Sequence, residues 1–191
     1  IWNTIYKKLF RMDPMKNTQS LLNVSIIETF KSGELQELCK STEEAILSGI
    51  GFSWINPPPR RQLENYWKGV LVVPFRCLLI GTLDGVVAGS LQLVFPVKSN
   101  EVSSFSASID THFVAPWARG KGLAKMLLES GENLARSKGF SQILLEVRET
   151  QERAISIYES AGYLKWGTLP TYHITGEEKI SGYFYYKEIV K

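Results

Sequence analysis

The strongest constraint on the fold is the sequence RGKGLA at residues 119–124, which lies between a strand-like segment, residues 105–114, and a long amphipathic pattern. The first N–H groups of a helix have no partner inside the helix, and glycine lets the backbone approach an anion closely. A strand, a glycine-containing turn and a helix start therefore predict a backbone site for a phosphate or pyrophosphate group. An ordinary solvated helix N-terminus has the same local pattern, so this stretch alone leaves both interpretations open.

The two commoner phosphate loops do not fit this stretch. A P-loop needs Gly-x-x-x-x-Gly-Lys-Ser/Thr, and a dinucleotide loop needs a third glycine where this chain has Lys125. The apolar residues after the turn instead recur at the spacing of one buried helix face, up to a stop at Gly139. A short apolar strand at 142–147 and a helix that stops at Gly162 follow. This βαβα order predicts two parallel neighbouring strands.

Two segments of this unit resemble motifs A and B of the GNAT superfamily of acyl-CoA-dependent N-acetyltransferases. The motif A pattern, Gln/Arg-x-x-Gly-x-Gly/Ala, is met by Arg119, Gly122 and Ala124. Residues 145–163, LEVRETQERAISIYESAGY, resemble motif B and follow at the expected separation. The resemblance implies an α+β (mixed α/β) fold: a central, mostly antiparallel sheet with one splayed parallel strand pair, flanked by helices.

The same resemblance implies acetyl-CoA as the cofactor. Its pyrophosphate would meet the N–H groups at 120–125, beside the mobile positive charges of Arg119 and Lys121. Its pantetheine arm would lie against the strand that ends at Val114, where the parallel strands splay, usually at a bulge. The Val114 N–H would polarise the thioester carbonyl, or else belongs to an ordinary strand end. The expected cofactor-binding residues are His112, Phe113, Val114, Arg119, Gly120, Lys121, Gly122, Leu123, Ala124, Lys125 and Gln151, the last standing where many members carry Asn.

The resemblance also implies the catalytic roles. Tyr158 stands where the family has its general acid, which protonates the departing thiolate, and a phenol with a pKa of about 10 is neutral at physiological pH. Glu146 aligns with the proton acceptor of ribosomal-protein-alanine acetyltransferases. From the residues alone, Tyr158 also fits the core face of a short amphipathic helix, and Glu146 a solvated strand end. Glu101, Asp110 and His112 remain alternative bases.

These residues predict an N-acetyltransferase that moves an acetyl group from acetyl-CoA to a primary amine of a small molecule or protein. The alternative is a non-catalytic acyl-CoA-binding module, which would require neither catalytic side chain. A phosphate-binding protein unrelated to CoA is a weaker third hypothesis. Five aromatic residues fit either the wall of an acceptor slot or the core: Trp54, Tyr66, Trp67, Trp166 and Tyr172.

Composition and charge narrow the class further. The net charge is only +3, and no basic run with interleaved aromatic residues argues for a nucleic-acid partner. No apolar run reaches the length of a membrane span, and two histidines are too few for a metal site of usual composition. The distant Cys39 and Cys77 suit free thiols in a reducing compartment, which favours the cytoplasm, although a disulfide stays open. A homodimer also stays open.

The remaining segments fit a single domain at 23–191, preceded by an N-terminal extension at 1–22 that lacks the apolar core of a secretory signal. Asp84-Gly85 predicts a tight hairpin turn. A second hairpin should close the sheet through a long connection. The expected strands are 24–30, 75–83, 86–95, 101–114, 163–168 and 182–190, and the expected helices are 33–47, with Ser32 as its cap, and 60–73.

Overall fold

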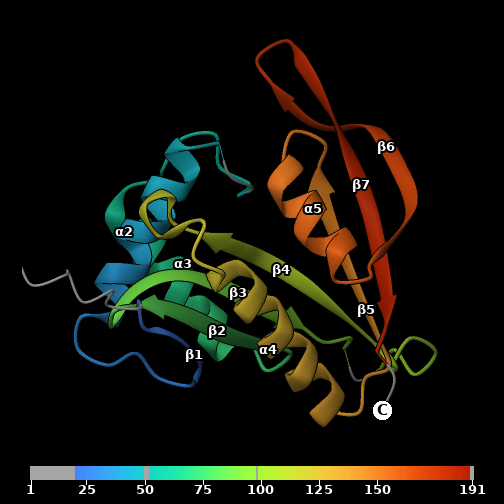
Figure 1. Ribbon diagram of the computed structural model, residues 1–191, viewed down its shortest axis with the longest axis horizontal. Helices are drawn as coiled ribbons and strands as arrows, with labels where there is room; N and C mark the ends of the chain where they lie inside the picture. The colour runs from blue at the N-terminus through green and yellow to red at the C-terminus, as the bar shows by residue number, and fades with distance from the viewer. Residues whose placement is uncertain (1–19, 50–51, 98, 190–191) are drawn as a thin grey trace, which may run out of the picture.

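One mixed sheet organises the protein (Figure 1). The computed structural model describes residues 20–49, 52–97 and 99–189, so the predicted extension at 1–22 lies almost wholly outside the described residues. The strands are β1 (Leu22–Ile27), β2 (Arg76–Leu83), β3 (Val86–Val94), β4 (Ser106–Val114), β5 (Gln142–Arg148), β6 (Leu164–Thr175) and β7 (Glu178–Glu188). Their order is β1-β2-β3-β4-β5-β7-β6, and the neighbours are antiparallel except for the parallel pair β4 and β5. The predicted fold class is therefore confirmed.

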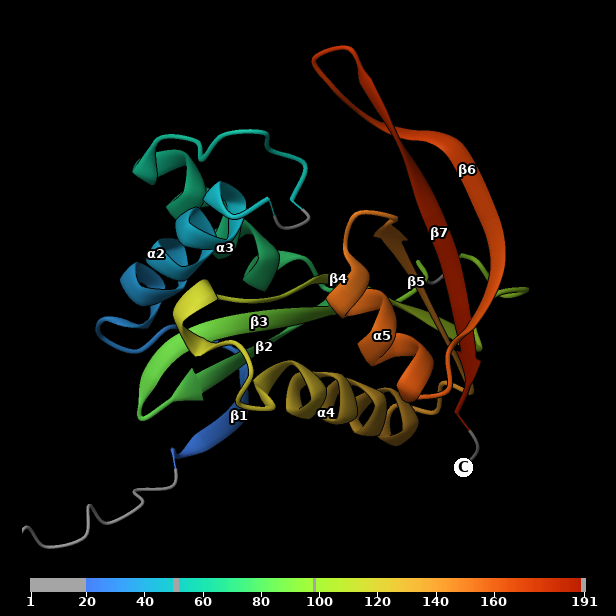
Figure 2. The ribbon, with the colours of Figure 1, turned by 45° about the horizontal axis from the view of Figure 1, so that its top comes forward.

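Helices cover both faces of this sheet. They are α2 (Glu34–Leu47), α3 (Arg60–Val72), the 3-10 turn η1 (Pro116–Ala118), α4 (Leu123–Ser137) and α5 (Glu152–Ser160). α2 and α3 pack on one face, whereas α4 and α5 lie against the other (Figure 2). Successive side chains of β2 alternate accordingly: Leu79 joins the core beneath α4 and α5, and Leu78 and Ile80 join the core beneath α2 and α3. The sheet is thus held between two separate cores.

The start of α2 corrects one prediction. Gly33, rather than Ser32, is the N-cap residue, with a φ of 89° and no side-chain cap. The Lys31 N–H instead donates to Glu34 Oε2 at 2.7 Å. A left-handed residue at this position suits glycine, so the chain turns into the helix through Gly33 and leaves Ser32 outside it.

The hairpin between β2 and β3 forms as predicted. Asp84 and Gly85 make its two-residue turn, with φ angles of 52° and 85°. Positive φ at both central residues is the type I′ geometry that Asp-Gly favours, because its twist matches that of the strands. Residues 76–94 therefore form the most locally determined part of the sheet.

The closing hairpin differs from the prediction. β6 and β7 continue to a two-residue turn at Gly176 and Glu177, so the expected long connection is wrong. Most residues of β6 are exposed. The sequence of β6 therefore lacks the alternation of apolar and polar residues by which a half-buried strand is recognised. The register also shifts: Leu169 pairs with Gly182, and the next pair is His173 with Ile180. Residues 170–172 therefore form a bulge opposite a single residue of β7.

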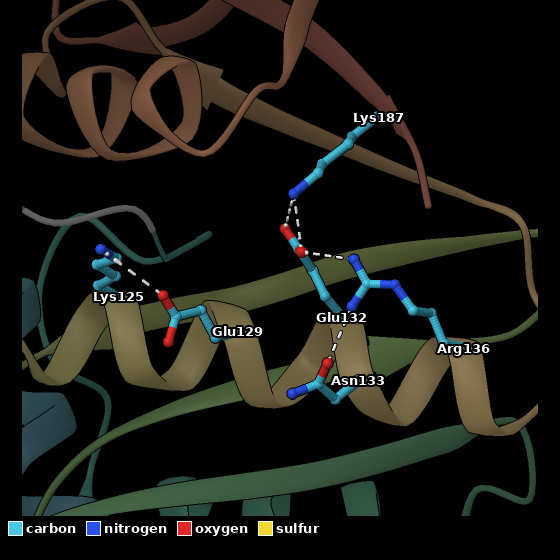
Figure 3. A network of polar contacts seen from close by, with 6 residues as sticks. All are labelled: Lys125, Glu129, Glu132, Asn133, Arg136 and Lys187. Atoms are coloured by element: carbon cyan, nitrogen blue, oxygen red, sulfur yellow. Dashed lines mark hydrogen bonds and ion pairs between the residues drawn. The ribbon is translucent and has the colours of Figure 1, made fainter. Parts of the chain in front are cut away.

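A buried ion cluster joins α4 to β7 (Figure 3). Glu132 has a side chain only 6% exposed, and both of its carboxylate oxygens lie 2.8 Å from Lys187 Nζ. Arg136 donates to Glu132 Oε2 at 3.2 Å and to Asn133 Oδ1 at 2.9 Å. One carboxylate thus pairs with two cations, which fixes the closing hairpin to the long helix.

Within the described ranges, no helix has both the length and the apolar character needed to cross a membrane. The same residues contain no cluster of three or more His, Cys, Asp or Glu side chains able to hold a metal ion. Cys39 is buried, Cys77 is half-buried, and both are free thiols.

Candidate active site

The parallel strands β4 and β5 separate near the middle of the sheet. They pair only from Ser106 with Gln142 to Ser108 with Leu144, and no further pairs follow toward their carboxyl ends. β5 instead continues along β7 up to Arg148. The splayed pair expected from the resemblance is therefore present, and it leaves the end of β4 with one side open.

A bulge accompanies this separation. Gln92 of β3 pairs with Asp110, and Ser90 pairs with Phe113. The two β4 residues in between, Thr111 and His112, therefore lie opposite the single residue Leu91 of β3. The first of them, Thr111, has a φ of 43°, which is unusual for a β-branched residue. Its N–H is satisfied by Asp110 Oδ1 at 2.7 Å. The local sequence thus stabilises the bulge that the resemblance implied.

A cavity of about 810 Å³ occupies the space between the separated strands, α5 and the closing hairpin. Glu146 enters it from β5, and Tyr158 enters it from α5. The two residues predicted to be catalytic therefore share one cavity. His112 and Gln151, predicted to contact the cofactor, line it as well.

The glycine-containing turn leads directly from η1 into α4. Gly120 and Gly122 have φ angles of 76° and 93°, so both adopt the left-handed conformation that glycine tolerates. No side chain caps the helix, and its first backbone hydrogen bond runs from Met126 N–H to Gly122 C=O at 3.1 Å. The preceding N–H groups therefore point out of the helix end, as an anion site requires. Leu123 anchors the turn by burying its side chain in the core.

The charged side chains of this turn differ in role from the prediction. Arg119 was expected to be mobile, but its Nε donates to the carbonyl of Val114 at 3.1 Å and its Nη2 donates to Ser48 Oγ at 2.6 Å. Burial, and secondarily the charge of Arg153, lower the pKa of Arg119. Arg119 therefore fixes the turn against the end of β4. Lys121 and Lys125 remain at the surface, where Lys125 pairs with an exposed glutamate.

Phe113 and Val114 present only backbone to the open side of β4. The ring of Phe113 packs edge-on against Phe52 at 5.2 Å in the core beneath α2 and α3. The side chain of Val114 is buried in the opposite core. β3 approaches this segment closely, because a Cβ on Gly89 would lie 2.3 Å from the carbonyl oxygen of Phe113. The strand end is thus rigid and has no strand partner on the β5 side. The β4 residues that line the cavity end at His112, so Phe113 and Val114 lie just beyond it.

Tyr158 is held by a histidine. Its side chain is buried, and its hydroxyl oxygen lies 3.0 Å from Nδ1 of His112. Nε2 of the same imidazole lies 3.0 Å from the carbonyl oxygen of Ala124 in the first turn of α4. Both ring nitrogens are engaged, so His112 does not offer the free lone pair that its role as an alternative base would need.

Comparison with known proteins identifies the family. The profile described as Acetyltransferase (GNAT) family matches residues 37–163. An N-acetyltransferase encoded in the hisH–hisA intergenic region of Azospirillum brasilense is 51% identical over 132 residues, which cover 69% of this chain and 79% of that protein. The chain belongs to the GNAT family of acetyltransferases.

Solved structures agree with the GNAT fold. An N-acetyltransferase from Staphylococcus aureus Mu50 superposes with a TM-score of 0.74 at 18% identity, covering 88% of this chain and 99% of its own. A putative acetyltransferase from Salmonella typhimurium, solved with its cofactor acetyl-CoA, superposes with a TM-score of 0.72 at 14% identity, covering 89% of this chain and 95% of its own. At such low identities these likenesses concern the fold alone.

Tyr172 of this GNAT chain lines the same cavity as Glu146, although the sequence suggested for it only a place in the wall of an acceptor slot or in the core. Tyr172 lies in the β6 bulge and lines the cavity. Burial, and then hydrogen bonding to Glu146, raise the pKa of Tyr172. Its ring packs edge-on against Phe184 at 6.0 Å and over Gly182, where a Cβ would lie 2.3 Å from the ring. The bulge thus places Tyr172 on the wall of the cavity that Glu146 also lines, and no local pattern in the sequence indicated this placement.

Two motif B side chains hold the segment that follows α2. Gln151 Nε2 donates to the carbonyl of Gly49 at 2.8 Å, and Arg148 Nη2 donates to the carbonyl of Phe52 at 3.2 Å. The amide of Gln151, expected to meet the CoA arm, therefore contacts the main chain on the far side of the cavity.

The other expected residues divide between cavity and core. Asp110 lines the cavity and pairs with Arg76 at 2.8 Å, whereas Glu101 is exposed and lies outside the cavity. Trp67 is a core residue with no exposed surface. Trp54 and Tyr66 line a neighbouring cavity of about 480 Å³, and Trp166 and Tyr172 line the main one.

Proposed function

We propose that this GNAT protein transfers the acetyl group of acetyl-CoA to a primary amine of a small molecule or a protein. One observation carries the proposal: Tyr158 and Glu146 enter the same cavity, beside the open edge of β4. A thioester laid along that edge would bring its reacting carbon between an acid and a base.

The cofactor would be held mainly by backbone. The outward N–H groups at 120–125 would receive the pyrophosphate, with Lys121 and Lys125 adding charge from the surface. The unpaired edge of β4 at His112, Phe113 and Val114 would pair with the pantetheine arm. The Val114 N–H would polarise the thioester carbonyl, a contribution of about 3 kcal/mol for a well-placed donor.

The transfer would then need two proton movements. The neutral amine nitrogen attacks the thioester carbon, a C–N bond forms, and the C–S bond breaks. Glu146 takes the proton that the nitrogen loses, directly or through water, and Tyr158 gives its hydroxyl proton to the departing thiolate. Exchange with solvent restores both side chains, so the products are the amide and CoA.

The main alternative is a non-catalytic module that binds acyl-CoA. Such a module would need the turn at 119–124 but not the acid and the base. The pairing of Tyr158 with His112, and the placement of Glu146 in the same cavity, favour the enzyme because binding alone requires neither. We further propose that residues 23–191 form one catalytic domain and that the free thiols of Cys39 and Cys77 reflect a cytoplasmic location.

Replacing Tyr158 with Phe tests the catalytic assignment. We expect kcat to fall at least about tenfold, the loss typical of a general acid, while the dissociation constant for acetyl-CoA stays the same. Turnover is measured as thiol release from acetyl-CoA with whichever amine of a panel of small amines and peptides reacts fastest. Tyr163→Phe is the matched control, since that ring packs edge-on against Tyr158 at 5.9 Å but does not line the cavity. Equal turnover of Tyr158→Phe and the wild type would remove Tyr158 from the mechanism.

A further inference from the structure

The bulge in β4 decides which way His112 points. Before the bulge, Ala107 and Ile109 belong to the core beneath α4 and α5, and after it Val114 belongs to the same core. Side chains of a strand alternate between the two faces of the sheet. The face covered by α4 and α5 therefore receives odd-numbered residues of β4 before the bulge and even-numbered residues after it. The extra residue therefore turns His112 toward α4 and α5 instead of toward α2 and α3.

His112 consequently bridges the two helices that build the site. α4 and α5 lie on the same face of the sheet (Figure 2). One imidazole contacts the carbonyl of Ala124 in the first turn of α4 and the hydroxyl of Tyr158 on α5, each at 3.0 Å. The helix whose N-terminus would bind the cofactor is thus linked through a single side chain to the proposed acid.

The chemistry of the partners fixes the protons. A carbonyl oxygen only accepts, so Nε2 of His112 carries the ring proton and donates to Ala124. Nδ1 of the neutral ring is then an acceptor, and the hydroxyl of Tyr158 donates to it. Burial lowers the pKa of His112 to about 4, so at neutral pH the ring holds the hydroxyl without taking its proton. Burial also raises the pKa of Tyr158, which keeps the phenol neutral.

We propose that His112 is a positioning residue that fixes the hydroxyl oxygen of Tyr158 at the cavity wall for proton transfer to the CoA thiolate. The inference depends on the proposed acetyl transfer. In that step the hydroxyl turns about its C–O bond from Nδ1 to sulfur, the O–H bond breaks, the S–H bond forms, and the phenolate takes its next proton from water. Nδ1 is the one hydrogen-bond partner that residues 20–49, 52–97 and 99–189 give to this hydroxyl.

Two substitutions separate the two hydrogen bonds of the imidazole. In His112→Asn, the side-chain oxygen can occupy the place of Nδ1 and still accept from Tyr158. In His112→Gln, the amide nitrogen can occupy the place of Nε2 and still donate to Ala124, but the acceptor for Tyr158 is lost. We expect the Asn variant to retain at least about a third of the wild-type kcat and the Gln variant to lose at least about tenfold, with the KM for acetyl-CoA unchanged in both. In a Tyr158→Phe background the Gln substitution should lower kcat no further, because the hydroxyl that it would misplace is absent.

Equal kcat values for the Asn and Gln variants would overturn the inference. So would a loss of kcat from His112→Gln in the Tyr158→Phe background as large as the loss that it causes in the wild type. A second readout does not depend on activity: the chain has 2 histidines, so nitrogen-15 spectra of histidine-labelled protein resolve the ring of His112. We expect a neutral ring with its proton on Nε2. If the wild type is active but its His112 ring is protonated on Nδ1, this inference alone is contradicted. If the ring is neutral with its proton on Nε2 but the wild type shows no turnover, the proposed function is contradicted and the inference with it.

Discussion

Two regions of the molecule form the site in different ways. The proposed cofactor region, residues 106–160, is continuous in sequence and offers mainly backbone: an open strand edge and a helix start. The proposed acceptor region consists of α2, α3 and the hairpin of β6 and β7, and would offer mainly side chains. Local glycine, strand and helix patterns determine the first region, whereas the second exists only after distant segments pack.

The two regions meet at a small number of polar contacts. Arg119, Arg148 and Gln151 of the cofactor region each bond to the segment that follows α2. On the other side, the ion cluster around Glu132 joins α4 to β7, and therefore to the hairpin that carries Tyr172. If these contacts make the regions one cooperative unit, weakening them should destabilise both together.

The largest effect is expected from Glu132→Gln. This change removes the carboxylate charge that pairs with both Lys187 and Arg136, whose side chains are 20% and 33% exposed. We expect a loss of about 2–3 kcal/mol in the free energy of unfolding, somewhat less than for a fully buried pair because both cations keep some contact with water. Urea unfolding followed by tryptophan fluorescence and by circular dichroism measures it, and the two transitions should coincide.

Glu129→Gln is the control for that experiment. Glu129 pairs with Lys125 at 3.7 Å on the same helix, but both side chains are more than half exposed, so little change in stability is expected. Equal stability of the two variants would show that the buried cluster does not join the regions. Separate transitions for the two probes in Glu132→Gln would instead show that the hairpin unfolds independently.

The same contrast explains what the sequence could predict. The turn around Gly122, the stop at Gly139 and the parallel strands were all predictable, because each depends on residues close together in the chain. The placement of Tyr172 in the cavity with Glu146 was not, since it requires a bulge in an exposed strand without alternation. The link from His112 to Tyr158 was missed for a related reason: the bulge at Thr111 reverses the facing of every later residue of β4, and only the structure locates it.

A smaller effect is expected from Tyr172→Phe, which probes the acceptor region alone. The change keeps the ring against Phe184 but removes the hydroxyl beside Glu146. Loss of a polar group from the cavity wall near the proposed base should lower kcat about fivefold, equivalent to about 1 kcal/mol, without changing the dissociation constant for acetyl-CoA. Tyr186→Phe is the control, because Tyr186 lies on β7 of the same hairpin but not in the cavity. Weaker acetyl-CoA binding in Tyr172→Phe would contradict the division into two regions.

The decisive experiment for the proposed pyrophosphate site at the start of α4 is a calorimetric titration with acetyl-CoA. It compares the wild type with the variants Gly122→Ala and Gly139→Ala. The two glycines flank α4 with φ angles of 93° and 87°, so alanine costs a similar strain of about 1–2 kcal/mol at either position, but only Gly122 lies where the pyrophosphate would approach. We expect micromolar binding by the wild type and Gly139→Ala, at least about tenfold weaker binding by Gly122→Ala, and no binding of ATP. Equal affinity in all three proteins, or no binding of acetyl-CoA by the wild type, would contradict the proposed site.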